Sequence, residues 1–250
     1  MALDLIYLHG ITKGPPPNGK KLTTIILEAA LPLISNIELM AYSVEYESVL
    51  DNSWGAKLRR WAAQLLLKRY IGGAGLALVD GLVTDLLWDI LDLWLFPNIR
   101  KRAVQKVKKN LRHHARIGRE FKNSKAVLIC HSAGSVVITS ALAEMPDIAE
   151  YVSKVVFIGS PFGSTLPPVR GLTKKVFEDD LRQALTHGGL KQGELWNVYS
   201  TADMIAGPFK DLLIPVRNIE SAPAHPHTDL KSYLNTTFKV LAQDLKNDQK

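Results

Sequence analysis

The sequence predicts an α/β fold with a mostly parallel central sheet that carries helices on both faces. Short apolar runs alternate along the chain with longer segments of helical spacing. This alternation is typical of strand–helix–strand units, whose strands lie parallel in one sheet. The apolar runs are nearly continuous, which favours strands that are buried on both faces. Since neither a repeat nor a low-complexity linker divides the 250 residues, we expect a single domain over residues 1–250.

The composition is that of an ordinary globular domain, because 46% of the residues are hydrophobic and 22% are charged. These proportions exclude a disordered chain and a collagen-like fibre, and the single cysteine excludes an internal disulfide. The residues that follow Met1 include no cationic segment of the kind that opens a signal peptide. We therefore expect a cytoplasmic protein, or one exported by a route that leaves no cleaved signal.

Largely apolar runs predict strands at residues 3–8, 37–44, 126–130, 154–159 and 195–199, and we expect a last strand at residues 216–220. Apolar residues at helical spacing predict helices at residues 22–33, 103–121, 135–144 and 229–245. Between the first strand and the first helix, residues 13–20 are rich in glycine and proline and predict a surface loop. Pro146 ends the third helix, because its ring cannot continue a helix.

Ser132 lies in the segment Cys130-His131-Ser132-Ala133-Gly134, between the third predicted strand and a predicted helix. A tight turn from strand to helix would expose the serine hydroxyl at the carboxyl edge of the sheet. Such a turn accepts only small residues two positions before and two positions after the serine. Gly134 meets this requirement, and Cys130 is small but is not glycine. The alternative is an ordinary junction at which Ser132 caps the helix.

The segment resembles the nucleophile elbow, Gly-x-Ser-x-Gly, of the α/β-hydrolase superfamily, with Cys130 in the place of the first glycine. The chain is thus similar to the lipase- and esterase-like bacterial serine hydrolases of this superfamily. The resemblance implies the α/β-hydrolase fold, Ser132 as the nucleophile and an acyl-enzyme intermediate, with no metal or organic cofactor. His131, beside the nucleophile, would border the substrate or serve the structure of the elbow.

A second motif, Leu8-His9-Gly10-Ile11, follows the first predicted strand and resembles the oxyanion loop of lipases and esterases. Attack on an ester creates a negative oxygen, which backbone N–H groups stabilise. By the resemblance, Ile11 and Ala133 would supply these two N–H groups. His9 and Gly10 would line the substrate, and their alternative role is a simple turn after a strand.

The resemblance also supplies an acid and a base. Asp203 follows the fifth predicted strand and matches the carboxylate that orients the histidine, with Asp211 as the fallback. The alternative for Asp203 is a loop or helix cap, which is a common role of aspartate. His227 lies between the last strand and the last helix and matches the catalytic base, with His225 as its rival. The order Ser132, Asp203, His227 is the nucleophile–acid–base order of the superfamily.

About 80 residues separate the second and third predicted strands, far more than a crossover helix needs. We expect residues 48–98 to form a helical cap. Its apolar residues would act as a lid or acyl-binding cover, or would simply pack the cap onto the domain. The end of this segment is long enough for a membrane span, but Asp85, Asp89 and Asp92 share one helical face. This pattern predicts an amphipathic helix instead.

The positive charge is concentrated in one segment. The whole chain has a formal net charge of +7, but residues 100–125 alone hold eleven Lys or Arg against one acid, Glu120. An anionic membrane surface or a phosphate-bearing substrate would suit this charge, and a solvated helix face is the alternative. We expect no nucleic-acid partner, because no recognition motif accompanies the charge.

These features predict a serine hydrolase that cleaves carboxylic esters of small-molecule or lipid substrates. A phospholipase or a thioesterase is the alternative among enzymes. A catalytically silent hydrolase-fold protein that binds a membrane or a protein partner is the alternative from another class. We expect no metal site, because the remaining histidines lack partners at metal-ligand spacing. Residues 159–164, Gly-Ser-Pro-Phe-Gly-Ser, would form a wall of the active site.

Overall fold

The computed structural model of the chain describes residues 2–8, 19–34, 37–44, 46, 93, 96–165, 167–203, 205–210, 215–223 and 229–247. Within these ranges, six strands form one sheet in the order β2-β1-β3-β4-β5-β6, and all neighbouring strands are parallel. The strands are β1 (Ala2–Leu8), β2 (Glu38–Val44), β3 (Ser124–His131), β4 (Val152–Ile158), β5 (Glu194–Tyr199) and β6 (Arg217–Glu220). The sheet confirms the predicted fold class. The predicted cap at residues 48–98 lies outside the described residues, except for residues 93 and 96–98.

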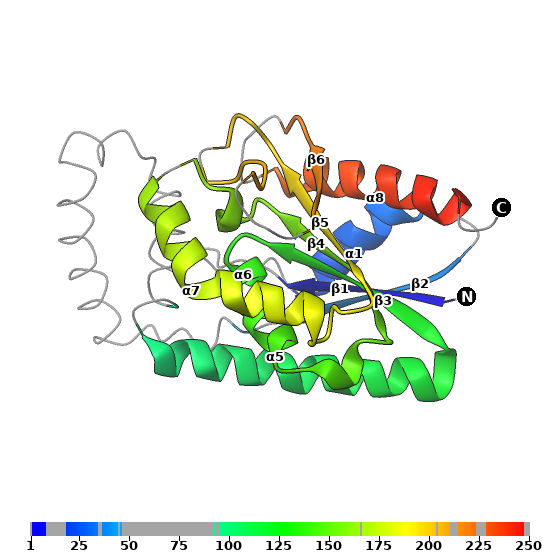
Figure 1. Cartoon of the computed structure of the whole chain (residues 1–250). Coiled ribbons are helices and arrows are strands. Elements are labelled where there is room, and N and C mark those ends of the chain that lie inside the picture. The colour runs from blue at the N-terminus through cyan, green and yellow to red at the C-terminus, as the bar shows by residue number, and fades with distance from the viewer. Residues whose placement is uncertain are drawn as a thin grey trace.

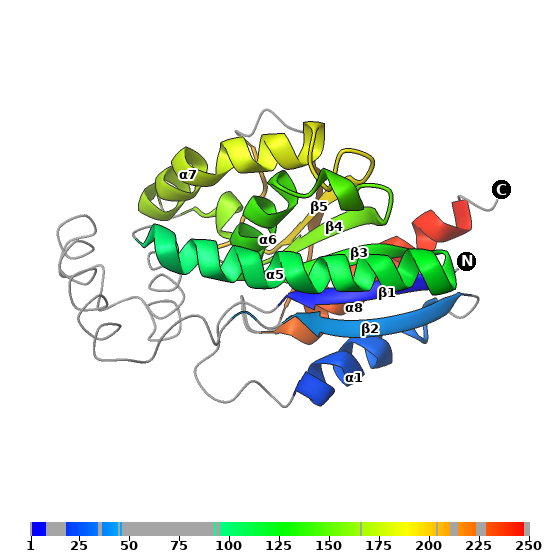
Figure 2. The same cartoon turned by 90° about the horizontal axis from the view of Figure 1, so that it is seen from below.

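Helices cover both faces of the sheet (Figures 1 and 2). On one face lie α5 (Pro97–Ile117), α6 (Ala133–Ala143) and α7 (Pro167–Thr186). On the other face lie α1 (Gly19–Ala30) and α8 (Leu230–Asn247), which contact each other. Short helices join some of these elements, namely η2 (Gly118–Lys122), η3 (Pro146–Ile148) and η4 (Pro161–Gly163).

Two hydrophobic cores fill the space between the sheet and its helices. On β3, Leu128 and Cys130 belong to the core under α5, α6 and α7. Val127 and Ile129 belong to the core under α1 and α8. Successive side chains of a strand point to opposite faces, so a strand covered on both sides needs apolar residues at every position. This requirement explains the unbroken apolar run at residues 126–130.

The register of the sheet brings the carboxyl ends of the strands to one edge. Leu8, the last residue of β1, pairs with Cys130. His131 pairs with Ile158 at the end of β4, and Ile158 pairs with Val198 of β5. Open parallel sheets bind their ligands outside this edge. The segment that follows each strand is therefore where functional side chains are expected.

The helix α7 is not among the elements that the sequence patterns predict. Its first residues, Pro167 and Pro168, and the nearby Gly171 disfavour the interior of a helix. Proline is nevertheless compatible with the first turn, where a backbone N–H has no partner within the helix. Further along, residues at intervals of three or four are buried: Val169, Thr173, Phe177, Leu181 and Ala184. This spacing packs α7 against the core.

The positively charged segment at residues 100–125 lies mainly in α5, which has eight Lys or Arg and no Asp or Glu. The Lys108 ammonium contacts Glu144 at 2.5 Å, and the Arg112 guanidinium contacts Asp147 at 2.9 Å. Other cations of α5 are exposed, namely Lys101, Arg102, Lys109 and Arg116. None of the helices in the described part of the chain has the length and hydropathy that crossing a bilayer requires.

Candidate active site

Ser132 occupies a strained turn between β3 and α6. Its backbone has a φ of 54° and a ψ of −126°, in a region that residues with a side chain rarely adopt. Strain of this kind costs about 1–3 kcal/mol and persists only where the surroundings enforce it. The Ser132 N–H donates to the Ile158 carbonyl of β4 at 2.9 Å, and the Ser135 N–H donates to the Ser132 carbonyl at 3.0 Å. These bonds hold the turn from both sides.

The hydroxyl of Ser132 does not cap the helix that follows it. Ser132 stands at the N-cap position of α6, but its side chain makes no capping hydrogen bond. Helix capping therefore does not explain the serine at this position. Ser132 is 1% exposed, so the surrounding residues enclose it at the carboxyl edge of the sheet.

A second serine, Ser135, braces the turn from within α6. Its hydroxyl donates to the Ser132 carbonyl at 2.6 Å and also lies 2.9 Å from the Ser160 hydroxyl. The Ser160 hydroxyl in turn accepts a hydrogen bond from the Phe162 N–H at 3.3 Å, at the start of η4. Ser135 thus joins the turn at Ser132 to the loop after β4. Ser135 was not among the predicted site residues, although a serine within an apolar helix is a signal for such a bond.

Two residues close to Ser132 in sequence, Cys130 and Ala133, are small and fully buried. Burial raises the pKa of the Cys130 thiol well above its ordinary value, so the thiol stays protonated and does not compete as a nucleophile. Ala133 is the first residue of α6, where backbone N–H groups have no partner within the helix. An amide at this position can donate to an oxyanion. His131 ends β3 and is 8% exposed.

Asp203 lies in the turn that follows β5 and is 3% exposed. Its Oδ1 accepts a hydrogen bond from the Ile205 N–H at 2.9 Å, and the Tyr233 hydroxyl of α8 lies 3.5 Å from its Oδ2. The Asp203 N–H donates to the Ser200 carbonyl at 3.1 Å. The carboxylate is therefore held in one orientation. Its bond to Ile205 is also the kind that aspartate makes in an ordinary turn.

The structure describes four of the predicted site residues, and all four lie at the carboxyl edge of the sheet: His131, Ser132, Ala133 and Asp203. The other candidates lie outside the described residues, namely His9, Gly10, Ile11, Asp211, His225 and His227. Their roles stay predictions. His9 directly follows Leu8, the last residue of β1. His227 precedes Leu230, the first residue of α8, by three positions in the sequence.

The loop after β4 meets the segment after β5 through two glycines. A Cβ added to Gly163 would lie 1.9 Å from the Gly207 carbonyl oxygen, so these backbones approach more closely than any side chain allows. The Asn197 side chain of β5 fixes Gly207 by donating to its carbonyl at 3.0 Å. The Phe209 N–H donates to Asn218 of β6 at 2.9 Å. The segment is therefore tied to the sheet.

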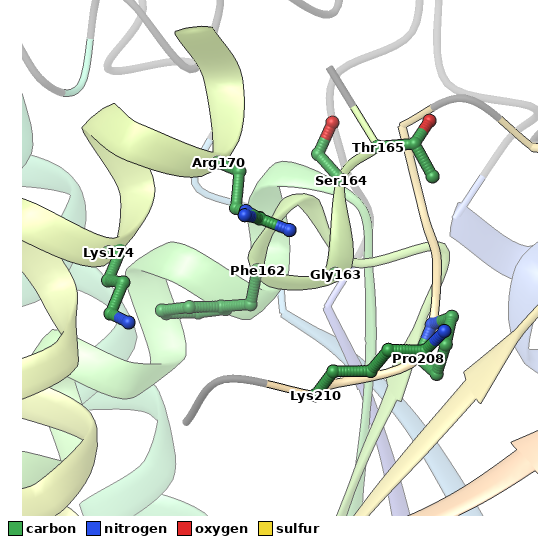
Figure 3. A pocket seen from close by; sticks show the side chains of 8 residues that line it. All are labelled: Phe162, Gly163, Ser164, Thr165, Arg170, Lys174, Pro208 and Lys210. Carbon is green, nitrogen blue, oxygen red and sulfur yellow. The ribbon is translucent and has the colours of Figure 1, made fainter. Parts of the chain in front are cut away.

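A cavity of about 220 Å³ opens beside these two segments. It is lined by η4, by the start of α7 and by residues that follow β5, as Figure 3 shows. Its described lining consists of Phe162, Gly163, Ser164, Thr165, Arg170, Lys174, Pro208 and Lys210. The loop at residues 159–164 was predicted to form a wall of the site, whereas Arg170, Lys174 and Lys210 were not among the predicted site residues. A cavity of about 310 Å³ near Lys125 and Glu150 lies toward the opposite edge of the sheet.

In the part of the chain that the structure describes, no group of His, Cys, Asp and Glu side chains is arranged to hold a metal ion. The described residues of the site can instead supply a buried hydroxyl, a fixed carboxylate and helix amides. Such groups serve nucleophilic attack and charge stabilisation.

Comparison with known proteins relates the region around Ser132 to one family. A family model described as alpha/beta hydrolase matches residues 99–175, which run from α5 through the Ser132 turn to the first part of α7. No curated protein matches the sequence.

Three solved structures are among those that match the chain. A prolyl endopeptidase matches at 10% identity and a TM-score of 0.33, over 57% of this chain, which spans only 25% of that protein. A variant of tomato methylketone synthase I, complexed with β-ketoheptanoate, matches at 10% identity and a TM-score of 0.44, over 100% of this chain and 98% of the other. Carboxyl esterase 2 from the mycorrhizal fungus Tuber melanosporum matches at 11% identity and a TM-score of 0.43, over 98% of this chain and 77% of the other.

Proposed function

Since the chain belongs to the α/β-hydrolase superfamily, we propose that it is a serine hydrolase that cleaves carboxylic esters of small-molecule or lipid substrates. Ser132 is the nucleophile, His227 is the base and Asp203 orients the histidine. The observation that carries the proposal is the backbone of Ser132, whose positive φ at a strand-to-helix turn is the geometry that a nucleophile elbow requires. The absence of a capping bond from its hydroxyl supports the same role.

The reaction proceeds in two acyl-transfer steps. His227 takes the proton of the Ser132 hydroxyl while the oxygen bonds to the acyl carbon, and Asp203 stabilises the imidazolium. The carbonyl oxygen becomes an oxyanion, which accepts hydrogen bonds from the N–H groups of Ala133 and Ile11. The ester C–O bond then breaks, and the alcohol leaves with the proton from His227. Water attacks the acyl-enzyme by the same route and releases the acid and the free serine.

The surroundings of Asp203 support its role as the orienting acid. A carboxylate that is 3% exposed needs hydrogen-bond donors in place of water, and the Ile205 N–H supplies one. Its contact with Tyr233 also fixes it against α8, the helix that begins after the segment with His227. A carboxylate fixed in this way holds a histidine in one tautomer and one orientation.

Labelling by a fluorophosphonate probe tests the proposal directly. We expect the wild type to be labelled, and Ser132→Ala and His227→Ala to lose labelling, because the probe needs an activated serine. Ser153→Ala is the matched control. Ser153 is a partly buried serine of β4 whose hydroxyl donates to the Ala126 carbonyl, near the opposite ends of the strands. Circular dichroism of each variant separates a loss of labelling from a loss of fold.

Two results would contradict the proposal. One is undiminished labelling of Ser132→Ala, which would place the reactive residue elsewhere. The other is a folded wild type that is not labelled either in buffer or with detergent or liposomes. The second condition is needed because Ser132 is 1% exposed, and an interface could be required to open access to it. An unlabelled protein that still binds liposomes would favour the catalytically silent alternative. Labelled protein would then be assayed on oxygen esters, thioesters and phospholipids.

A further inference from the structure

A pair of buried serine hydroxyls, which the proposed reaction does not use, joins the loop after β4 to the first turn of α6. Ser135 of α6 and Ser160 of the loop are both 0% exposed, and their hydroxyl oxygens lie 2.9 Å apart. Gly159, which has a φ of 59°, turns the chain at the end of β4 directly before Ser160. Because neither serine is exposed, each hydroxyl has to satisfy its hydrogen bonds within the protein.

The positions of the two hydroxyl protons follow from their partners. The Ser132 carbonyl can only accept, so the Ser135 hydroxyl donates its one proton to it, at 2.6 Å. The proton between the two serines must then come from Ser160. The Ser160 hydroxyl in turn accepts from the Phe162 N–H at 3.3 Å. The three hydrogen bonds therefore run in one direction, from the Phe162 N–H to the Ser132 carbonyl.

This chain of bonds ends on the peptide group that would stabilise the oxyanion. The Ser132 carbonyl and the Ala133 N–H belong to one trans peptide group, so they point in opposite directions. The carbonyl points into the first turn of α6, where the Ser135 N–H also donates to it at 3.0 Å. The Ala133 N–H therefore points out of the helix, which begins at this residue. A carbonyl that accepts two hydrogen bonds polarises its peptide group and makes the N–H a stronger donor.

We propose that Ser135 and Ser160 are positioning residues of the oxyanion hole, the set of N–H groups that bind the oxyanion. They orient and polarise the peptide group whose N–H belongs to Ala133. The inference rests on the proposed hydrolase function, in which this N–H binds the oxyanion. Hydrogen bonds in a chain strengthen one another by about 10–30% per bond, and the effect is larger where water is excluded. Ser132, Ser135 and Ser160 are all exposed by 1% or less, so the chain meets this condition.

The expected effect on catalysis is a decrease in kcat without a change in KM. The oxyanion forms only during the reaction, so weakening its donor leaves substrate binding unaltered. Removal of a whole oxyanion donor lowers kcat by about 10²–10³-fold. Ten to thirty per cent of this effect on a logarithmic scale corresponds to about two- to eightfold. We expect Ser135→Ala to lower kcat by this factor and to leave KM as in the wild type.

Three further variants separate polarisation of the peptide group from simple support of the turn. Ser135→Thr keeps a hydroxyl that can bond the carbonyl three residues earlier, so it should restore most of kcat. Ser160→Ala leaves the bonds from Ser135 to the turn in place, but it removes the donor to the Ser135 hydroxyl. It should still lower kcat, by a smaller factor than Ser135→Ala. Thr139→Val is the matched control and should leave kcat unchanged, because its buried hydroxyl donates to the Ser135 carbonyl, in a different peptide group of α6.

Nuclear magnetic resonance tests the polarisation without any reaction. Serine labelled with ¹³C at its carbonyl, combined with ¹⁵N-alanine, selects the three Ser-Ala pairs of the chain. Ser132→Ala removes the signal of its own pair and so identifies the Ala133 resonance. The ¹⁵N shift of a peptide group responds to hydrogen bonds at its carbonyl, because these bonds polarise the group. We expect Ser135→Ala to move the Ala133 resonance upfield, Ser160→Ala to move it less, and Thr139→Val to leave it in place.

These tests separate the failure of this inference from that of the proposed function. A shift of the Ala133 resonance that requires both serine hydroxyls supports the chain of bonds even if no ester is hydrolysed. An unchanged resonance in Ser135→Ala and Ser160→Ala would overturn it. A loss of kcat in Ser135→Ala alone would also overturn it, since Ser135 would then only support the turn. An active esterase in which folded Ser135→Ala keeps the wild-type kcat would overturn the inference and leave the hydrolase proposal intact.

Discussion

Replacing Ser132 by glycine is expected to stabilise the fold while removing the proposed nucleophile. Ser132 has a φ of 54° and a ψ of −126°, which crowd a Cβ against the backbone. Glycine has no Cβ and adopts positive φ without this penalty. Ser132→Ala keeps the Cβ and loses only the hydroxyl. The comparison of the glycine variant with the alanine variant therefore isolates the backbone strain from the loss of the side-chain oxygen.

The expected difference follows from two opposing contributions. Relief of the strain should stabilise the glycine variant by about 1–3 kcal/mol. The greater freedom of glycine in the unfolded chain should destabilise it by about 0.4–1 kcal/mol relative to alanine. The net expectation is that Ser132→Gly is more stable than Ser132→Ala by about 1 kcal/mol. In a chain of 250 residues, a difference of this size raises Tm by about 2–4 °C.

Urea unfolding followed by circular dichroism, together with calorimetric Tm values, measures this difference. The m-value should be the same in both variants, so that the shift in midpoint reports stability alone. Ser132→Gly could be less stable than Ser132→Ala only if position 132 were unstrained, because glycine then costs unfolded-state entropy without relieving any strain. The strain argument for the turn would then be wrong, and the main structural support for the nucleophile would be lost with it.

Three further perturbations probe other parts of the chain. Gly163→Ala should lower the free energy of unfolding by about 2 kcal/mol or more in urea titrations, because its Cβ would meet a carbonyl oxygen at 1.9 Å. Gly171→Ala is its control, since that Cβ would meet nothing within 4 Å and alanine favours a helix. A hydrogen bond from Lys154 lowers the pKa of Glu194 in the folded protein. The ionised Glu194 therefore stabilises the fold above its pKa in the unfolded chain, and this stabilisation is lost as pH falls through the folded-state pKa. Urea midpoints of wild type and Glu194→Gln should therefore converge in acid. Because α5 has exposed cations, we expect the protein to co-sediment with anionic vesicles but not with neutral ones. The double variant Lys109→Glu/Arg116→Glu should co-sediment less with anionic vesicles.

The strands could be predicted from the sequence because their physical cause is local. A strand buried on both faces needs an apolar residue at every position, and β3 satisfies this over residues 126–130. The bounds were less well predicted where pairing decides them. β4 begins at Val152, before the predicted start at residue 154, because Val152 pairs with Ala126 across a register shift. Such a shift depends on the neighbouring strand and leaves no mark on the local pattern.

The site was predictable only to the extent that its residues have fixed positions along the chain. The serine at the end of a buried strand could be recognised, but its φ of 54° could not, because strain is a property of the folded backbone. The bond between Ser135 and Ser160 joins α6 to the loop after β4 and is equally hidden. Arg170 and Lys174 belong to α7, which the sequence pattern did not predict because the helix begins with two prolines. Their meeting with a segment beyond β5 depends on the strand order.

The hydrogen bonds around Ser132 contribute enough free energy to offset the strain in its backbone. The turn is fixed by bonds from β4, from the backbone of α6 and from the Ser135 hydroxyl. A hydrogen bond within a folded protein contributes about 0.5–1.5 kcal/mol net, so three together offset a strain of about 1–3 kcal/mol. The same Ser135 hydroxyl contacts Ser160, whose hydroxyl accepts from the Phe162 N–H and so orders η4 and one wall of the cavity beside it. The strained turn of the proposed nucleophile and the loop after β4 therefore depend on shared hydrogen bonds.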